Sequence, residues 1–247
     1  MKIIVIRSGS SGNATLIYDE GRLLLIDMGV TLTLLKEGLS IIDKKVLDID
    51  ALLLTHNHSD HTKGVSYVKP VPIYCTKDTY KGNEVNEIVP YEKFMINHFT
   101  ITPISASHDA PSTVGFVIKN KKEKLVYLTD TGMIPEKTLS KMKNADYYII
   151  ESNHNIKKLH QTHRPAYLKL RILSDEGHLS NEASAIYMSE LVGDKTKEII
   201  LAHISEEANE PELALKAYRK IFQKCHIDLS NINLHCASQQ EIVLGGK

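Results

Sequence analysis

Apolar residues recur along the chain in short runs that are separated by polar or glycine-rich turns. Six runs are rich in β-forming residues, three at the N-terminus and three in the middle of the chain: residues 2–7, 13–18, 22–27, 99–104, 113–118 and 124–129. Runs of this length with short polar connections are typical of antiparallel strands. The pattern therefore predicts two antiparallel meanders, one after the other along the chain.

Fully apolar runs and segments with helical spacing follow each meander. The apolar runs are residues 51–54, 147–150 and 198–202; an extended segment is expected at 71–75, and helices after Thr31 and over 76–81, 181–192 and 211–224. In the helix over 181–192, we predict that Ala183, Ile186 and Leu191 face the core. The repeated order predicts an α/β protein in which two sheets pack together with helices outside.

The chain of 247 residues is 42% apolar, which is enough for a sizeable core. No linker, composition shift or internal repeat divides it, so we predict a single domain over residues 1–247. Cys75, Cys225 and Cys236 have no CxxC spacing and are expected to be free thiols. The apolar run before Arg7 has only four residues, too short for a signal peptide, so a cytoplasmic protein is expected.

Four potential metal ligands follow the apolar run 51–54: His56, His58, Asp60 and His61. His56 and His58 alternate in an extended segment and can face the same way, whereas the other two come where residues 62–65 resemble a helix start. The two pairs can point to different places, which suits two metal ions better than one. Imidazoles beside a carboxylate fit Zn²⁺, with Mn²⁺ or Fe as alternatives.

The spacing His-x-His-x-Asp-His resembles the signature of the metallo-β-lactamase superfamily. Oxygen-reducing di-iron members carry a glutamate where this chain has His58, so the motif favours hydrolysis over redox chemistry. The resemblance implies three further ligands, His108, Asp130 and His203, which occur here in the superfamily's order. It also implies a four-layer αβ/βα sandwich, in which two mixed β-sheets pack face to face with helices outside.

The same resemblance implies a site for two divalent metal ions. The first ion would be held by His56, His58 and His108, the second by Asp60, His61 and His203, and Asp130 would bridge them. A hydroxide shared by the two metals would attack the substrate, and Asp60 could accept its proton. Asp27, at the end of the third β-run, is expected to support the ligand loop by hydrogen bonding without binding metal.

Two further elements narrow the resemblance to a branch. Gly177-His178-Leu179-Ser180 resembles the Gly-His-Ser-Thr element of the tRNA-processing ribonuclease RNase Z, and Glu151 falls where that enzyme has a catalytic-site glutamate. The neighbours of Glu151 and the Ser-Gly-Ser-Ser-Gly-Asn segment at 8–13 agree better with the WalJ/YycJ branch of bacterial DNA exonucleases. On this resemblance, His178 would assist the leaving oxygen, and Glu151 would act with it.

Charge is distributed unevenly, although the formal net charge of the chain is zero. The segment 152–174 has no acidic residue and carries Lys157, Lys158, Arg164, Lys169 and Arg171. A charge run is usually a solvated helix face. Because this one lies between Glu151 and His178 in the sequence, we expect it to bind phosphate groups.

The sequence thus predicts a metal-dependent phosphodiesterase that acts on nucleic acid, with DNA favoured and no membrane association. Exonuclease action in the 5′-to-3′ direction is implied by the resemblance alone. A small-molecule hydrolase for a thioester, lactone or cyclic phosphodiester is the alternative, since the same metal site serves these substrates. A third hypothesis is a non-catalytic metal-dependent binding or sensing protein, which has no need of an open two-metal centre.

Overall fold

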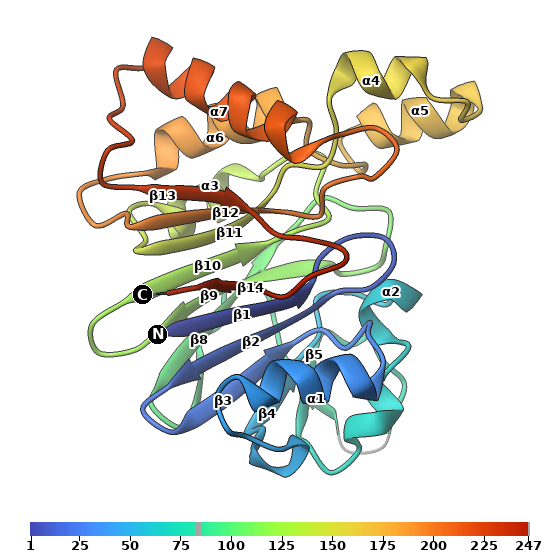
Figure 1. Cartoon of the computed structure of the whole chain (residues 1–247). Coiled ribbons are helices and arrows are strands. Elements are labelled where there is room, and N and C mark those ends of the chain that lie inside the picture. The colour runs from blue at the N-terminus through green and yellow to red at the C-terminus, as the bar shows by residue number, and fades with distance from the viewer. Residues whose placement is uncertain (83–84, 247) are drawn as a thin grey trace.

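The computed structural model describes residues 1–82 and 85–246. Within this part of the chain, two seven-stranded sheets lie face to face and helices cover their outer sides (Figure 1). Both sheets contain parallel and antiparallel pairs. The predicted four-layer αβ/βα sandwich of two mixed sheets is therefore confirmed.

The first sheet combines an antiparallel meander with three parallel strands. In spatial order its strands are β14 (Val243–Gly245), β1 (Lys2–Arg7), β2 (Ala14–Asp19), β3 (Arg22–Ile26), β4 (Ala51–Leu53), β5 (Ile73–Cys75) and β6 (Val85–Glu87). Strands β1 to β3 pair antiparallel, as predicted, and β3 to β6 pair parallel. The C-terminal strand β14 closes the edge beside β1, a pairing that the sequence did not indicate.

The second sheet repeats this plan. Its spatial order is β13 (Asn233–Cys236), β12 (Glu198–Ala202), β11 (Tyr147–Glu151), β10 (Lys124–Leu128), β9 (Val114–Lys119), β8 (Phe99–Ser105) and β7 (Phe94–Ile96). Strands β7 to β10 form the second antiparallel meander, and β10 to β13 run parallel. The two halves of the chain thus share one architecture.

The helices complete the outer layers. They are α1 (Leu32–Ser40), α2 (Ser59–Thr62), α3 (Glu136–Met142), α4 (Ile156–Gln161), α5 (Ala166–Leu173), α6 (Asn181–Leu191) and α7 (Pro211–Lys224), with short 3₁₀ turns at Val46–Asp48 and Val65–Val68. Helix α1 covers the first sheet, α6 and α7 cover the second, and α4 and α5 extend beyond the sheets at one end (Figure 1). Among the described residues, no helix is long and apolar enough to cross a membrane.

Two predictions about helices were wrong. Residues 76–81 form only a turn, in which Thr76 and Thr79 bond through their hydroxyls at 2.7 Å. In α6, Ile186 is 52% exposed, because Ala185, Met188 and Leu191 supply the buried face instead. Ser184 sets this orientation, because its hydroxyl bonds the carbonyl of Glu151 and the hydroxyl of Tyr218. The rotation of α6 about its axis therefore depends on polar contacts that the spacing of hydrophobic residues does not report.

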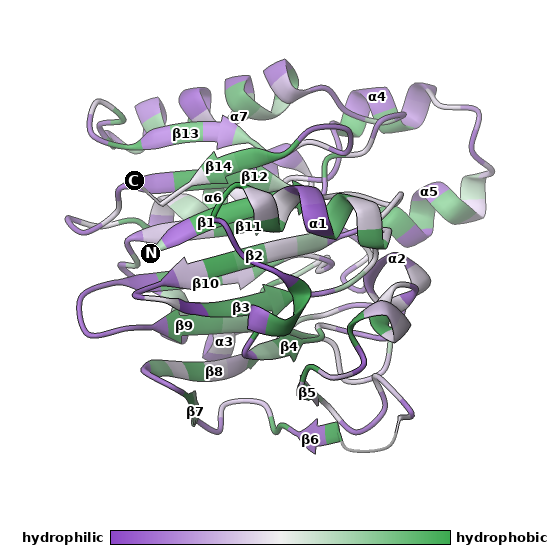
Figure 2. Ribbon diagram, turned by 60° about the horizontal axis from the view of Figure 1, so that its bottom comes forward, coloured by the Kyte–Doolittle hydropathy of each residue, from purple (hydrophilic) through white to green (hydrophobic). Residues whose placement is uncertain are grey.

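One apolar cluster fills the space between the sheets. It joins Ile26 and Leu53 of the first sheet to Phe116 and Tyr127 of the second. Hydrophobic positions concentrate on the strands, whereas the connecting loops are largely hydrophilic (Figure 2). Full burial of each large apolar side chain contributes about 1.5–3 kcal/mol. This packing holds the ends of β3, β4, β10 and β12 close to one another.

Candidate active site

Three strands of the sandwich end in polar residues with an unusual backbone. Asp27, Asp130 and His203 follow β3, β10 and β12, and their φ angles are 58°, 57° and 55°. Left-handed φ values are uncommon outside glycine, although Asp and His tolerate them better than most residues. Such strain persists where surrounding contacts enforce it and is concentrated at functional sites. The three strand ends therefore mark one candidate site.

The histidine-rich loop follows β4 and enters α2. His58 is the residue before the helix, so α2 starts earlier than predicted and carries Asp60 and His61. His56 and His58 belong to one group of candidate ligands, and Asp60 and His61 belong to another. Gly29 lets the loop pack closely, because a Cβ there would lie 1.6 Å from the carbonyl oxygen of Asp60.

Four of the predicted ligand histidines are oriented by a contact to Nδ1. The partner atoms are Thr55 Oγ1 for His56 at 3.0 Å, Asp27 Oδ2 for His61 at 2.8 Å, the Gly177 carbonyl for His108 at 3.2 Å, and Glu151 Oε1 for His203 at 3.0 Å. A partner at Nδ1 fixes the ring and leaves Nε2 for a metal ion. Asp27 lies where the sequence prediction put it, since its carboxylate also accepts bonds from the amide and hydroxyl of Thr55.

The predicted ligands come together in the expected groups. His56, His58 and His108 form one group, and Asp60, His61 and His203 form another. Asp130 groups with His56 and His61, between the two sets. Within each group the candidate ligand atoms lie within 4.8 Å of one another.

Unpaired polar atoms test whether metal ions fit these groups. Among the described residues, His56 Nε2, Asp130 Oδ2 and His203 Nε2 are buried and have no hydrogen-bond partner. Burying polar atoms unpaired is unfavourable, and a pair of divalent cations, one at each ligand group, would satisfy all three. Imidazoles with carboxylates are the donor set of a zinc or related dinuclear site. The residues therefore fit a pair of divalent ions.

Local electrostatics favour the metal-coordinating forms of Asp130 and His56. Burial would raise the pKa of Asp130, but the neighbouring His203 and His61 hold it well below its usual range. Burial and the nearby His61 lower the pKa of His56 well below its usual value. An ionised carboxylate and a neutral imidazole are the forms that coordinate metal.

Glu151 links the site to His178. Its Oε1 accepts bonds from Nδ1 of His178 at 2.9 Å and of His203 at 3.0 Å. The amides of Asp130, Thr131 and Leu179 donate to the same carboxylate. Although burial opposes it, the charge and hydrogen bond of His178 lower the pKa of Glu151 to about 2. Glu151 and His178, which the resemblance implied would act together, are therefore in direct hydrogen-bond contact.

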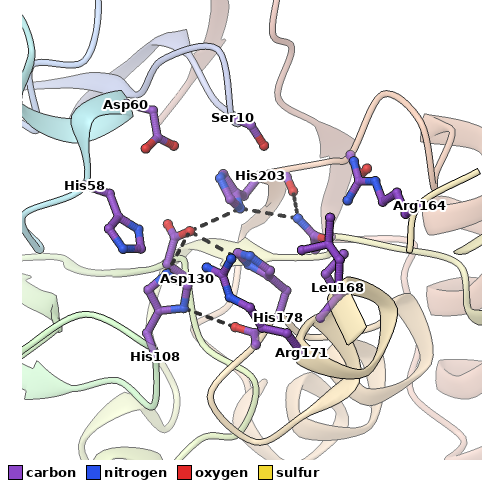
Figure 3. A pocket seen from close by; sticks show the side chains of 14 residues that line it. Ser10, His58, Asp60, His108, Asp130, Arg164, Leu168, Arg171, His178 and His203 are labelled. Carbon is purple, nitrogen blue, oxygen red and sulfur yellow. Dashed lines mark hydrogen bonds and ion pairs between the residues drawn. The ribbon is translucent and has the colours of Figure 1, made fainter. Parts of the chain in front are cut away.

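A cavity of about 230 Å³ opens over these groups. Metal-ligand candidates line one side, and the α4–α5 region and the loop after it line the other (Figure 3). The second side comprises Arg164, Leu168, Arg171, Ile172, Gly177 and His178. Ser10 from the first glycine-rich loop completes the rim together with Asn153 and Ser205.

The basic segment is only partly directed at this cavity. Arg164 and Arg171 line it, each paired with a carboxylate, Glu207 at 2.6 Å for Arg164 and Asp109 for Arg171. Lys158 Nζ instead bonds Glu210 at 2.6 Å.

The other two lysines do not line the cavity. Lys169 Nζ bonds the carbonyls of His160 and Thr162 at 2.8 and 2.7 Å, which closes the C-terminal end of α4. Lys157 is exposed on α4. Of the five residues predicted to contact phosphate, only the two arginines line the cavity, because the sequence could not show which cations the fold brings to it.

Sequence reasoning missed two residues that contact the ligand groups. Asp109 Oδ1 lies 3.3 Å from Nε2 of His108 and 3.8 Å from Nε2 of His58. Its position directly after His108 was the available signal. Asn13 Nδ2 lies 3.0 Å from Nε2 of His61, and only the packing of the first loop against α2 places it there.

Comparisons with known proteins agree with this geometry. The family model described as "Beta-lactamase superfamily domain" matches residues 22–204. The exodeoxyribonuclease YycJ of Bacillus anthracis is 30% identical over 233 residues, which cover 89% of this chain and 88% of that protein. The exodeoxyribonuclease WalJ of Streptococcus pneumoniae is 34% identical over 228 residues, 86% of this chain and 85% of the relative.

Solved structures share the fold. The metallo-β-lactamase fold protein YhfI from Bacillus subtilis superposes with a TM-score of 0.73 at 18% identity, covering 99% of this chain and 98% of its own. Human tRNase Z, short form, gives a TM-score of 0.67 at 16% identity and covers 98% of both chains. The family model and the two exodeoxyribonuclease relatives confirm the resemblance seen in the motifs, and the solved structures show the same fold.

Proposed function

Because this chain belongs to the beta-lactamase superfamily and is a hydrolase of that fold, we propose that it is a metal-dependent DNA exonuclease acting in the 5′-to-3′ direction. One observation carries the proposal: members of both groups of histidine and aspartate donors line the same cavity as two arginines. The exodeoxyribonuclease names of YycJ and WalJ support DNA as the substrate. Zn²⁺ is the favoured ion, and Mn²⁺ or Fe are alternatives.

The two ligand groups assign the ions. His56, His58 and His108 would hold one, and Asp60, His61 and His203 the other, with Asp130 between them. Such a pair of divalent ions supplies Lewis acidity and activates water at neutral pH.

In this proposal, Asp60 and His178 would move the protons. The Asp60 side chain is 22% exposed and lines the cavity, so its carboxylate can take a proton from the attacking water. His178 lines the cavity, and because its Nδ1 bonds Glu151, Nε2 is the ring nitrogen left for the substrate. As the new oxygen–phosphorus bond forms and the old one breaks, Nε2 can give its proton to the leaving oxygen.

Arg164 and Arg171 would hold phosphates on either side of the bond that is cleaved. Each guanidinium has five N–H donors, so pairing with one carboxylate leaves others for phosphate. Replacing either arginine by glutamine should reduce the slope of log affinity against log salt by about one. Lys158→Gln and Lys169→Gln are matched controls, since their ammonium groups have partners outside the cavity, and should leave that slope unchanged.

End-labelled single-stranded and duplex DNA and RNA test the proposal directly. We expect mononucleotides to be released in order from the 5′ end of DNA, with chelation stopping the reaction. Asp60→Ala, prepared in parallel, should be inactive. Turnover of bis(p-nitrophenyl) phosphate without degradation of any polymer would reject the nuclease proposal, and no turnover at all by metal-loaded protein would leave only a binding or sensing role.

A small-molecule hydrolase is the second candidate. It is favoured by the ion pairs of the basic segment, because the positive charges of Arg164, Arg171 and Lys158 are all paired with carboxylates of the chain itself. Paired cations release fewer counterions from a polyanion than free ones. A panel of thioester, lactone and cyclic phosphodiester substrates, assayed beside the labelled DNA, distinguishes the two.

A further inference from the structure

Helix α5 presents two different faces. Leu168 and Ile172 line the cavity, and Ile172 also packs in a small cluster with Leu159 and Ala208. Tyr167 and Leu170, in contrast, are 74% and 68% exposed, and Leu173 is 37% exposed. We call Tyr167, Leu170 and Leu173 the α5 stripe. Residues three apart on a helix lie on one side, so this stripe is a continuous apolar strip.

Arg171 lies between the stripe and the cavity. At about 100° per residue, its direction is roughly 40° from that of Tyr167 and roughly 60° from that of Leu168. Its guanidinium pairs with Asp109 beside the ligand histidines. Around the helix axis, the order is therefore Leu168 at the cavity wall, then the Arg171 cation, then the exposed ring of Tyr167. The stripe begins where the cavity ends.

The surroundings of the stripe favour one kind of occupant. Two large apolar side chains project from an eight-residue helix that extends beyond the sheets (Figures 1 and 2). Exposed apolar strips of this kind mark interaction sites. Segment 152–174 around it has no acidic residue, and Lys157 is exposed on the adjoining α4. An aromatic ring with cations on one surface is the arrangement that binds single-stranded nucleic acid, where bases stack and phosphates meet positive charge.

We propose that the α5 stripe is a stacking platform for unpaired bases of the strand whose phosphate enters the cavity. Tyr167 takes the base nearest the cavity, and Leu170 contacts the next one outward. Arg171 holds the phosphate between the reacting nucleotide and the stacked one. This inference rests on the proposed function, since it assumes that a nucleic-acid strand is the substrate.

The test combines protein variants with missing bases. Single-stranded phosphorothioate oligonucleotides, which resist hydrolysis, carry one abasic position moved stepwise from the 5′ end. For the unaltered protein we expect the affinity to fall roughly 5- to 100-fold when the abasic position meets Tyr167. Tyr167→Ala should weaken binding of the intact strand by a similar factor and lose sensitivity to that abasic position, whereas Tyr167→Trp should keep it.

Matched controls come from exposed residues elsewhere. Tyr67 is 51% exposed and Leu47 is 79% exposed, and neither lines the cavity. Tyr67→Ala and Leu47→Ala should bind every oligonucleotide as the unaltered protein does. Because Tyr167 is mostly exposed, Tyr167→Ala should unfold at the same urea concentration as the parent, which separates lost stacking from lost structure.

Two outcomes would overturn the platform. One is Tyr167→Ala binding with the parent's affinity and abasic profile. The other is a Tyr167→Ala protein that binds DNA as the parent does but has a different sedimentation coefficient. That result would make the stripe a contact between copies of the chain. Degradation of end-labelled DNA by the parent, measured alongside, shows whether the nuclease proposal stands when the platform fails.

Discussion

Glu151→Gln is the most informative single substitution in this protein. The carboxylate is fully buried and accepts five hydrogen bonds. Three go to Oε1, from the Asp130 amide, His178 and His203, and two go to Oε2, from the Thr131 and Leu179 amides. Glutamine has nearly the same shape but carries one NH₂ group. Whichever way the amide is turned, that group faces at least two donors.

The expected cost follows from this mismatch. Each buried donor left without an acceptor costs about 1–3 kcal/mol, so two of them destabilise the fold by about 2–6 kcal/mol. If the NH₂ group faces the imidazoles, His178 and His203 also lose the acceptor that orients them. We therefore expect weaker metal retention and a loss of hydrolysis that exceeds what partial unfolding explains.

Three measurements on one preparation check this expectation: urea unfolding, metal content by mass spectrometry, and turnover of bis(p-nitrophenyl) phosphate. Glu198→Gln is the control, because Glu198 is a buried carboxylate that accepts from His235 at 3.1 Å at the opposite end of β12 from His203. It should lose stability while keeping its metals. A Glu151→Gln protein with parental stability, metal content and turnover would refute the reasoning.

Three further predictions concern the ions, a proton acceptor and a buried histidine. Protein purified without chelator should contain about two divalent ions per chain, and folded protein with essentially none would contradict the dinuclear site. Asp60→Ala should abolish turnover with little change in urea stability, because the side chain is partly exposed; full activity would remove Asp60 from the site. Burial lowers the pKa of His154 from 6.5 to about 4 in the folded protein. As the pH falls from 6.5 to 4, the unfolded protein therefore takes up this proton before the folded protein does, and the free energy of unfolding decreases by up to about 3 kcal/mol. His154→Leu should flatten that part of the stability profile, since neither ring nitrogen has a partner among the described residues; an unchanged profile would exclude the mechanism.

The periodicity and local motifs of the sequence alone predicted many of the strands and the candidate metal ligands of this protein. Alternation and apolar runs located the strands of both meanders, because side-chain period and burial depend mainly on neighbouring residues. His56, His58, Asp60 and His61 were identifiable as candidate metal ligands from their spacing after an apolar run. The resemblance to the superfamily implied His108, Asp130 and His203 as further ligands and Asp27 as a supporting residue.

Contacts between distant segments were decided only by the tertiary structure. The internal partners of Lys158, Arg164 and Arg171 are carboxylates 43 to 62 residues away in the sequence, so no local pattern reveals which cations are paired. The same applies to Asn13 beside His61 and to the edge strands β13 and β14, which need a preformed neighbour to pair with. Ile186 faces outward because Ser184 bonds to Tyr218 of another helix. Sequence pattern reports which residues can be buried or can bind, whereas the choice among them depends on partners that only folding brings within a few ångströms.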